Sequence, residues 1–191
     1  LYYRPFLVMM YNGAPSNSQG EIAHSVCASL LTNNQEGGLL AMLSVDGDIM
    51  GASVSPVSFR NAGILMIQAF PSYDAGQRRY DSNKSVEKKV LHEIERLRNG
   101  EFTAEQLEAV KQAMIREYDM SMESSEFKAM TLASLFNTGN NPADIVTYRD
   151  RVAAITADDV KAVVDKYLTS NYLVVNVQEL RGDRKAEKLD K

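Results

Sequence analysis

The sequence predicts an α+β fold, in which a mostly antiparallel sheet carries a layer of helices packed on one face. Short apolar runs with strand character occur near both ends of the chain and over residues 49–70. Between them, apolar residues recur at helical spacing over several segments. The resulting order of a strand, two helices, two strands, several helices and a closing strand suits a two-layer domain.

The first part of the chain contains one predicted strand and two predicted helices. Residues 5–11, PFLVMMY, form a short apolar run that ends at Asn12 and Gly13, as a strand leading into a turn does. Apolar positions at helical spacing predict a helix over residues 19–31. A second, short helix is predicted over residues 39–43, directly after a pair of glycines.

Two strands that pair in antiparallel fashion are predicted next. Residues 49–59, IMGASVSPVSF, alternate as a half-buried strand does, and Pro56 favours an edge position or a bulge. The predicted inward residues of this strand are Met50, Ala52 and Val54. Residues 63–70, GILMIQAF, form a nearly continuous apolar run, which suits a more central strand.

The second half of the chain is predicted to be mainly helical. Residues 82–99 carry one apolar stripe, Thr103 with Gln106 forms a capping box for the next helix, and Thr156 with Asp159 is an acidic variant of that cap. The predicted inward residues are Val86, Val90, Ile94 and Leu97 in the first of these helices and Leu107, Val110, Met114 and Tyr118 in the second. The remaining predicted elements are helices around residues 127–136 and 143–154 and a strand over residues 172–177.

Length and composition are those of one ordinary globular domain. Of the 191 residues, 45% are hydrophobic and 24% are charged, which is far from disordered or membrane proteins. We expect residues 1–179 to form one domain. Residues 180–191 alternate charges without an apolar stripe, so we expect a linker or tail that leads to a further domain.

The charge and hydropathy patterns exclude two classes of partner. The net charge is −4, and no basic stripe with interleaved aromatic residues is present, so we expect no binding of nucleic acid. The longest apolar run, residues 6–10, is far shorter than the ~20 residues that a membrane helix needs, so we expect no membrane span.

The two histidines of the chain do not form a zinc motif. A hydrolytic zinc site built on a helix needs two ligands one turn apart. His24 has no carboxylate or imidazole one turn on, and after His92 that position is Arg96, so HxxEH and HExxH are both absent. We expect His92 to be a surface residue and His24 to be partly buried or at an interface. No metal ligand is predicted in this chain.

Other catalytic chemistries also lack their residues. Cys27, the single cysteine, lies on an apolar helix stripe near His24, which predicts a buried, protonated and inert thiol. The chain has no G-x-S-x-G elbow and no phosphate-binding glycine loop. Neighbouring carboxylates such as Glu93 and Glu95 are interpreted as charges on a solvated face. No catalytic residue is predicted, and the chain by itself is expected to cleave nothing.

Four stretches, taken in order, resemble the domain repeated in the pitrilysin and insulin-degrading-enzyme family of zinc peptidases, also called inverzincins. They are GAPSNSQGEIAHSVCASLLTNN, EGGLLAMLSVDGDIMGASVSPVSFRNAGILMIQAF, VEKKVLHEIERLRNGEFTAEQLEAVKQAMIREY and YRDRVAAITADDVKAVVDKYLTSNYLVVNV. They resemble, respectively, the first strand and helix of the family's domain, its paired strands, its long helix with the G-x-x-T-x-x-x-L connection, and the I-T-x-x-D-V helix before the last strand. Together they cover nearly the whole chain.

The resemblance implies an inactive domain of a zinc metalloendopeptidase, with the fold of the metallopeptidase domain shared with mitochondrial processing peptidase. Because HxxEH is missing, the catalytic roles of the family transfer to no residue here. Zinc is expected in a catalytic partner domain of the same or another chain. Family members can place an arginine and a tyrosine near the substrate, but no alignment assigns that role to Arg78, Arg79 or Tyr80. A periplasmic location is implied, with the cytoplasm as the alternative.

The candidate substrate-binding segment is the start of the predicted edge strand. It comprises Asp48, Ile49, Met50, Gly51, Ala52, Ser53, Val54 and Ser55. Small residues leave the main chain open to close approach, and an edge strand can hold an extended peptide by strand addition. The resemblance implies the same role, because the equivalent region of insulin-degrading enzymes anchors a substrate end away from the scissile bond. The alternative is a capped edge or an interdomain contact.

Three functions therefore remain open from the sequence. The first is a structural and substrate-contact domain that takes part in peptide hydrolysis only together with a separate HxxEH-bearing domain. The second is a stand-alone binding or assembly subunit that kept the fold without peptidase activity. The third is an enzyme of a different class with an unrecognised site.

Overall fold

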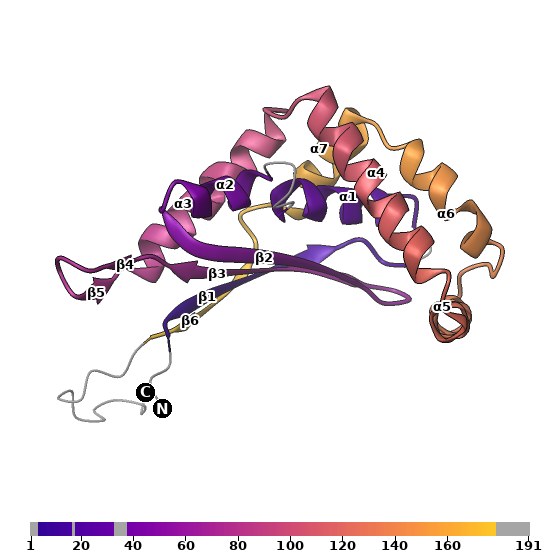
Figure 1. The fold of residues 1–191 in the computed structure, drawn as a ribbon, viewed down its shortest axis with the longest axis horizontal. Coiled ribbons are helices and arrows are strands. Elements are labelled where there is room, and N and C mark those ends of the chain that lie inside the picture. Colours follow the sequence, from indigo (N-terminus) through magenta and orange to yellow (C-terminus); the bar gives the residue numbers. More distant parts are fainter. Residues whose placement is uncertain (1–3, 17, 33–37, 179–191) are drawn as a thin grey trace.

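The main sheet confirms the predicted α+β architecture. The computed structural model describes residues 4–16, 18–32 and 38–178 (Figure 1). Four strands run in the order β2-β3-β1-β6, and each neighbouring pair is antiparallel. Their bounds are Phe6–Gly13 for β1, Ile49–Ser58 for β2, Gly63–Pro71 for β3 and Leu173–Val177 for β6. The predicted linker, residues 180–191, lies outside the described residues.

Helices form the second layer. Their bounds are Gly20–Thr32 for α1, Leu39–Val45 for α2, Asn83–Arg98 for α3, Ala104–Ser121 for α4, Ser125–Thr138 for α5, Asp144–Ala153 for α6 and Ala157–Tyr167 for α7. Figure 1 shows α1, α3, α4 and α7 on one side of the sheet and no helical layer on the other. In the described part of the chain, no helix is both long enough and apolar enough to cross a membrane.

A small hairpin is the one described element that the sequence did not predict. It consists of β4 (Tyr73–Asp74) and β5 (Arg79–Tyr80), which pair with each other and not with the main sheet. Each strand has only two residues, too few for a period-two pattern to be recognised. The ring contact between Tyr73 and Tyr80, with centroids 5.0 Å apart, joins the two strands.

Local capping explains why the predicted helix starts are accurate. Both predicted capping boxes form: the Gln106 N–H donates to Thr103 Oγ1 (3.1 Å), and the Asp159 N–H donates to Thr156 Oγ1 (3.2 Å). The return bonds from the two cap N–H groups are also present. Ser82 caps α3 by accepting from the Ser85 N–H. Each cap satisfies main-chain donors that the first helical turn leaves free.

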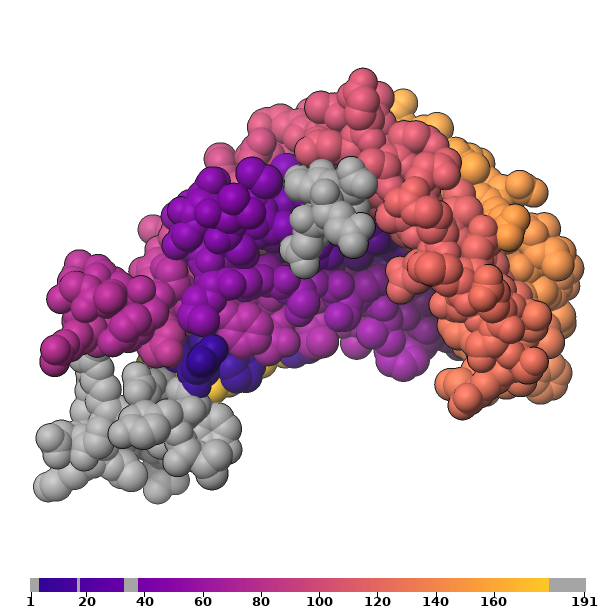
Figure 2. Space-filling model, in the orientation of Figure 1, coloured from indigo at the N-terminus to yellow at the C-terminus, as the bar shows by residue number. Residues whose placement is uncertain are grey.

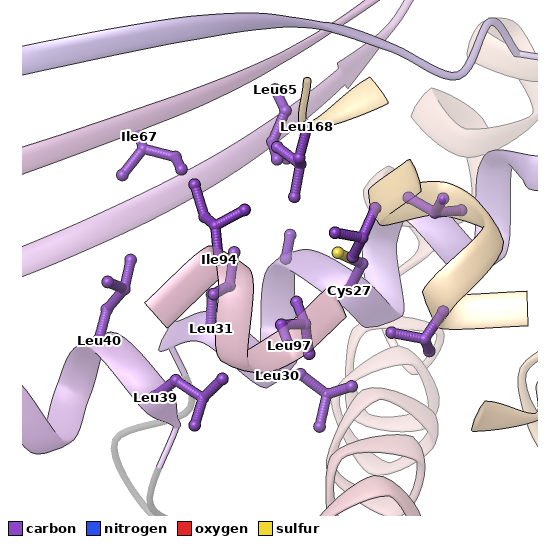
Figure 3. Close-up of a cluster of buried hydrophobic side chains, with 14 of the residues drawn as sticks. Cys27, Leu30, Leu31, Leu39, Leu40, Leu65, Ile67, Ile94, Leu97 and Leu168 are labelled. Atoms are coloured by element: carbon purple, nitrogen blue, oxygen red, sulfur yellow. The ribbon is translucent and has the colours of Figure 1, made fainter. Parts of the chain in front are cut away.

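The hydrophobic core lies between the sheet and the helices. Figure 3 shows Leu65 and Ile67 of β3 pointing toward Ile94 of α3 and Leu31 of α1. All four of the residues predicted to line the inward stripe of α3 are buried, and so is Cys27. Burial on this scale, at roughly 25 cal/mol per Å² of apolar surface, is the main source of stability in such a domain.

Two predicted orientations are wrong, and both errors have a physical cause. The β2–β3 register shifts between Ile49 and Gly51, so a bulge turns Met50 outward and buries Ile49 in its place. Ala52 and Val54 do pack on the core, as predicted. Glu93 is buried instead of solvated, because Arg96 one turn on reaches it and neutralises its charge (2.8 Å).

Candidate peptide-binding edge

The candidate segment lies at an edge of the main sheet, as Pro56 predicted. Among the described residues, β2 is paired with β3 on one side and has no strand on its other side. The opposite edge is β6, which is shorter, and its last carbonyl, on Val177, already accepts from Asn83 Nδ2 (3.2 Å). The longer β2 is therefore the better candidate for adding a strand.

The register shows which main-chain groups of β2 face away from the sheet. The Phe59 N–H donates to the Ala62 carbonyl (2.7 Å), which closes the β2–β3 hairpin. In antiparallel pairing, hydrogen-bonded residues alternate with residues whose N–H and C=O point outward. Counting back in twos, Ser53 and Ser55 bond to β3, whereas Ala52 and Val54 present their N–H and C=O groups to the free edge. Pro56 belongs to the same outward set, so its missing N–H costs the β2–β3 ladder no bond.

A charged contact fixes the start of the candidate segment. Asp48 precedes the strand, and Lys89 of α3 reaches it from across the fold. Lys89 Nζ donates to the Asp48 carbonyl (2.8 Å) and lies 3.0 Å from Asp48 Oδ1. Burial by itself lowers the pKa of Lys89. The hydrogen bonds that Lys89 donates to Asp48 and Asp81, together with the negative charges of these two residues, outweigh burial and raise the pKa overall. Asp48 is therefore an anchor for the strand and not a free peptide contact.

A loop covers the other end of β2. The Ser16 N–H donates to the Phe59 carbonyl (2.9 Å), and Ser58 Oγ donates to the Ala14 carbonyl (2.9 Å). With the bulge at Met50 on one side and this loop on the other, the free edge spans residues 51–56. We call this stretch the free edge of β2.

Side chains along the free edge are small and uncharged. A Cβ added at Gly51 would meet no atom within 4 Å, and Ser53 is exposed. Residues 51–56 include no charged group that would select one peptide sequence over another. Chemically, the edge can donate from the N–H groups of Ala52 and Val54 and accept at their carbonyls. Such groups bind an extended peptide through its main chain.

Ile49 and Met50, also part of the candidate segment, contribute in different ways. Ile49 is almost wholly buried and helps to hold the strand on the core. Met50, turned out by the bulge, is an exposed apolar side chain at the end of the free edge. The segment predicted as one site is thus divided into an anchor, Asp48 and Ile49, and an accessible part, residues 50–55.

The histidines occupy two unrelated environments. His24 of α1 is completely buried, beyond the partial burial expected, and no hydrogen-bond partner is present for either ring nitrogen in the described residues. Burial lowers its pKa to about 4, so it is neutral at pH 7. His92 of α3 is exposed, as predicted. Within the described ranges, no group of three or more His, Cys, Asp or Glu side chains could hold a metal ion.

Cys27 is the buried thiol that the sequence predicted. It has no exposed surface, and burial raises its pKa to about 12. A thiol in that state is protonated near neutral pH and is a poor nucleophile. Of the other residues considered near a substrate, Arg79 and Tyr80 form β5 and Arg78 precedes them, so all three lie on the small hairpin and not on β2.

Sequence reasoning missed Lys89 as part of this region. Lys89 lies 41 residues from Asp48, and no local pattern links the two positions. The sequence indicated only that Lys89 lies on α3, on the side away from the apolar stripe. Most lysines in amphipathic helices lie on that side, so this position did not point to a contact with Asp48.

Solved structures share this fold, although no protein-family model and no curated protein matches the sequence. The inactive peptidase domain of a Bordetella parapertussis protein superposes with a TM-score of 0.80 at 19% identity, over 96% of this chain and 97% of that one. The peptidase M16 inactive domain from Pseudomonas fluorescens has a TM-score of 0.71 at 16% identity, over 92% of this chain and 41% of that one. The periplasmic protease PqqL from Escherichia coli has a TM-score of 0.60 at 16% identity, over 87% of this chain and 18% of that one.

These similarities show that the chain has the fold of inactive M16 peptidase domains. The resemblance predicted from the four sequence stretches is confirmed at the level of the fold. The chain spans less than half the length of the Pseudomonas and Escherichia structures. Similarity below 20% identity carries no residue roles from those proteins to this one.

Proposed function

We propose that this chain is a non-catalytic domain of a pitrilysin-type zinc peptidase, which provides structure and peptide contact beside a separate HxxEH-bearing domain. The observation that carries this proposal is a peptidase-type fold whose two histidines are unsuited to metal binding. One is buried in the core on α1, and the other is alone on the surface of α3. The catalytic domain, and the zinc it would hold, belong to the same polypeptide or to a partner chain.

Metal and activity measurements test the non-catalytic part of this proposal. The purified chain is expected to bind no stoichiometric zinc and to leave an unstructured peptide intact. His24→Leu and His92→Gln should change neither result, because neither imidazole has a second ligand beside it. About one tightly held zinc per chain, lost in either variant, would contradict the proposal.

The free edge of β2 is the proposed peptide contact. Ala52 and Val54 offer outward N–H and C=O groups, and residues 51–56 have small side chains and no charge, which suits a peptidase that accepts many sequences. A peptide that adds to β2 as a strand would be bound through its main chain, so the site would select little among peptide side chains. A peptide held this way would be presented to the catalytic domain in extended form.

Proline substitution separates this contact from the stability of the sheet. Ala52→Pro removes an outward N–H, whereas Ala52→Ser keeps it and serves as the matched control. Losing one main-chain hydrogen bond and creating a clash should weaken binding of a fluorescein-labelled, unstructured peptide by about tenfold. Ser53→Pro, which removes a β2–β3 bond instead, should mainly lower the melting temperature. If Ala52→Pro melts like the wild type and binds the peptide equally well, β2 is a structural edge only.

A periplasmic location is part of the proposal. Support comes from the similarity in fold to the periplasmic protease PqqL. Fractionation of cells that produce the complete protein is the direct test. Recovery with a cytoplasmic marker enzyme would favour the alternative location.

A further inference from the structure

The free edge of β2 has little of the protection that keeps edge strands of native proteins apart. Charged side chains often provide that protection, but residues 49–59 contain none. Pro56 and the bulge at Met50 guard only the two ends, which leaves residues 51–55 open. Figure 2 shows purple atoms of β2 at the surface, below those of α2 and beside those of α4 and α5. This edge is therefore accessible to a strand from another chain.

The main-chain groups of this edge are complementary to themselves in one antiparallel register. Ala52 and Val54 are the residues whose N–H and C=O groups point outward. When Ser53 of one copy lies opposite Ser53 of another, Ala52 of each copy faces Val54 of the other. Each such pair exchanges two hydrogen bonds, so the two pairs form four. No outward group of Ala52 or Val54 is then left unpaired.

Pro56 and the bulge disfavour the neighbouring registers. With Val54 opposite Val54, Ala52 of one copy would face Pro56 of the other. Proline has no N–H, so the Ala52 carbonyl of each copy would lose its donor. With Ala52 opposite Ala52, Val54 would face Met50, where the bulge interrupts the regular ladder. The register centred on Ser53 is therefore the one that satisfies both outward residues.

The side chains along the edge allow two strands to approach each other. Ala52 and Val54 pack toward the core of their own chain. Gly51, Ser53 and Ser55 alternate with them and so lie on the face of the sheet away from the helices. In the register centred on Ser53, Ser53 lies opposite Ser53 and Gly51 lies opposite Ser55. No like charges meet across this junction, because none of these residues is charged.

We infer that two copies of this chain pair through β2 in this register and that the pair competes with a peptide for the free edge. Their two sheets then join into one sheet of eight strands, four from each copy. Both copies contribute the same edge, so the contact closes as a two-fold pair and does not extend into a fibre. The competition rests on the proposed peptide contact, whereas the pairing itself does not.

The size of the contact makes the pair transient. Five residues of β2 from each copy span about 17 Å, and a junction of that length is smaller than the interface of a stable dimer. A transient pair can release its edge to a peptide when the domain is dilute and occlude that edge when the domain is concentrated. Covalent trapping is therefore the appropriate measurement.

Cysteine cross-linking tests the register. Opposite residues that are not hydrogen-bonded have Cα atoms about 4.5 Å apart, a distance that a disulfide spans. With diamide, which takes up the two thiol hydrogens, Ser53→Cys in the full-length chain should form about tenfold more covalent dimer than Ser55→Cys. Ser55→Cys is the matched control, because its two copies would lie about 13 Å apart on the same face. Cys27 has no exposed surface and does not contribute.

Mixing two variants tests the antiparallel direction. Gly51 of one copy lies opposite Ser55 of the other in this register. Gly51→Cys and Ser55→Cys should therefore cross-link poorly alone and well when mixed. A Cβ added at Gly51 would meet no atom within 4 Å, so the substitution is tolerated. Circular dichroism melts of the reduced proteins check that all three variants fold.

The covalent dimer tests the competition. The Ser53→Cys dimer should bind the fluorescein-labelled, unstructured peptide about tenfold more weakly than the same protein after reduction. Wild-type protein treated with diamide should bind the peptide as before. If the reduced protein and the wild type bind no peptide, the proposed peptide contact is wrong, while the cross-linking results still decide the pairing.

Three results would overturn the inference. Equal cross-linking of Ser53→Cys and Ser55→Cys would indicate random collisions and would leave the edge to a peptide or a neighbouring domain. A mixture of Gly51→Cys and Ser55→Cys that cross-links no better than its components would exclude this register. A covalent dimer that binds the peptide as tightly as the reduced protein would show that pairing does not occlude the free edge.

Discussion

Both faces of the main sheet carry apolar residues, but their surroundings are opposite. On β1, Leu7 and Met9 point to the helices and are fully buried, whereas the neighbouring Val8 and Met10 lie on the opposite face, which no described helix covers and which we call the open sheet face (Figure 1). Alternation within a strand shows which residues share a face, but not whether another layer covers that face. The described helices cover one side only (Figure 1), so an apolar pattern is no proof of burial within the same chain.

α3 and α5 show the same contrast among helices. α3 has an apolar stripe on an otherwise polar surface, and every residue of that stripe is buried. α5 mixes apolar and polar residues without a single apolar stripe, and none of its residues is buried. An amphipathic stripe therefore predicted burial inside this chain, whereas the apolar residues of α5, which form no such stripe, are not buried against the described residues.

A charge introduced on the covered side of the sheet should lower the stability of the domain more than any other change proposed here. Ile94→Asp places a carboxylate in the core next to β3 and should lower the free energy of unfolding by more than about 4 kcal/mol, enough to unfold a marginally stable domain. Circular dichroism at 222 nm during heating measures this. A variant that melts at the wild-type temperature would mean that Ile94 does not face the core.

Two neighbouring residues of β3 allow a direct comparison of the faces. Leu65→Ala removes a completely buried side chain and should cost about 2 to 5 kcal/mol, whereas Ile64→Ala on the open sheet face should cost less than about 1 kcal/mol. Leu65 has no exposed surface and Ile64 is 37% exposed. Urea unfolding of both variants gives the difference. Equal losses would show that the open sheet face is covered within the monomer.

His24 should make the covered side sensitive to acid. Its folded pKa is about 4, below the ordinary value of 6.5, because burial disfavours the charged ring. As the pH falls, the unfolded chain binds a proton on His24 before the folded chain does. The contribution of neutral His24 to the free energy of unfolding is therefore complete above pH 6.5 and is lost between pH 6.5 and 4. Between pH 7 and 5 the loss should be about 2 kcal/mol.

Comparison of one variant with the wild type isolates that loss from the titration of carboxylates. His24→Leu should flatten the pH dependence of urea unfolding over this window relative to the wild type, because it removes the buried ring. If His24→Leu and the wild type lose equal stability between pH 7 and 5, the ring is not buried in neutral form.

Much of the fold could be predicted because its signals are local. The capping boxes at Thr103 and Thr156 set helix starts through contacts within three residues. Pro56 indicated the edge position of β2, since a proline has no N–H to give to a ladder. The outward turn of Met50 could not be predicted, because the bulge depends on how β2 and β3 align with each other.

The sequence predicted which segment forms the candidate site, but not which of its residues can contact a peptide. From the sequence, residues 48–55 were equivalent members of one strand. In the fold, Asp48 and Ile49 anchor the strand, and only the positions beyond them can meet a peptide. Which N–H groups face outward follows from the hairpin closure at Phe59 and Ala62, a contact that alternation of side chains does not reveal.

By itself the sequence determined the class of fold, the helix starts, the edge position of β2 and the absence of a zinc-binding motif. These properties depend on residue types and spacings within a few positions. Tertiary structure decided the burial of His24 and Glu93, the anchor from Lys89 to Asp48 and the exposure of α5. Each of these depends on which distant elements pack together, because burial and pairing are properties of neighbours in space and not of neighbours along the chain.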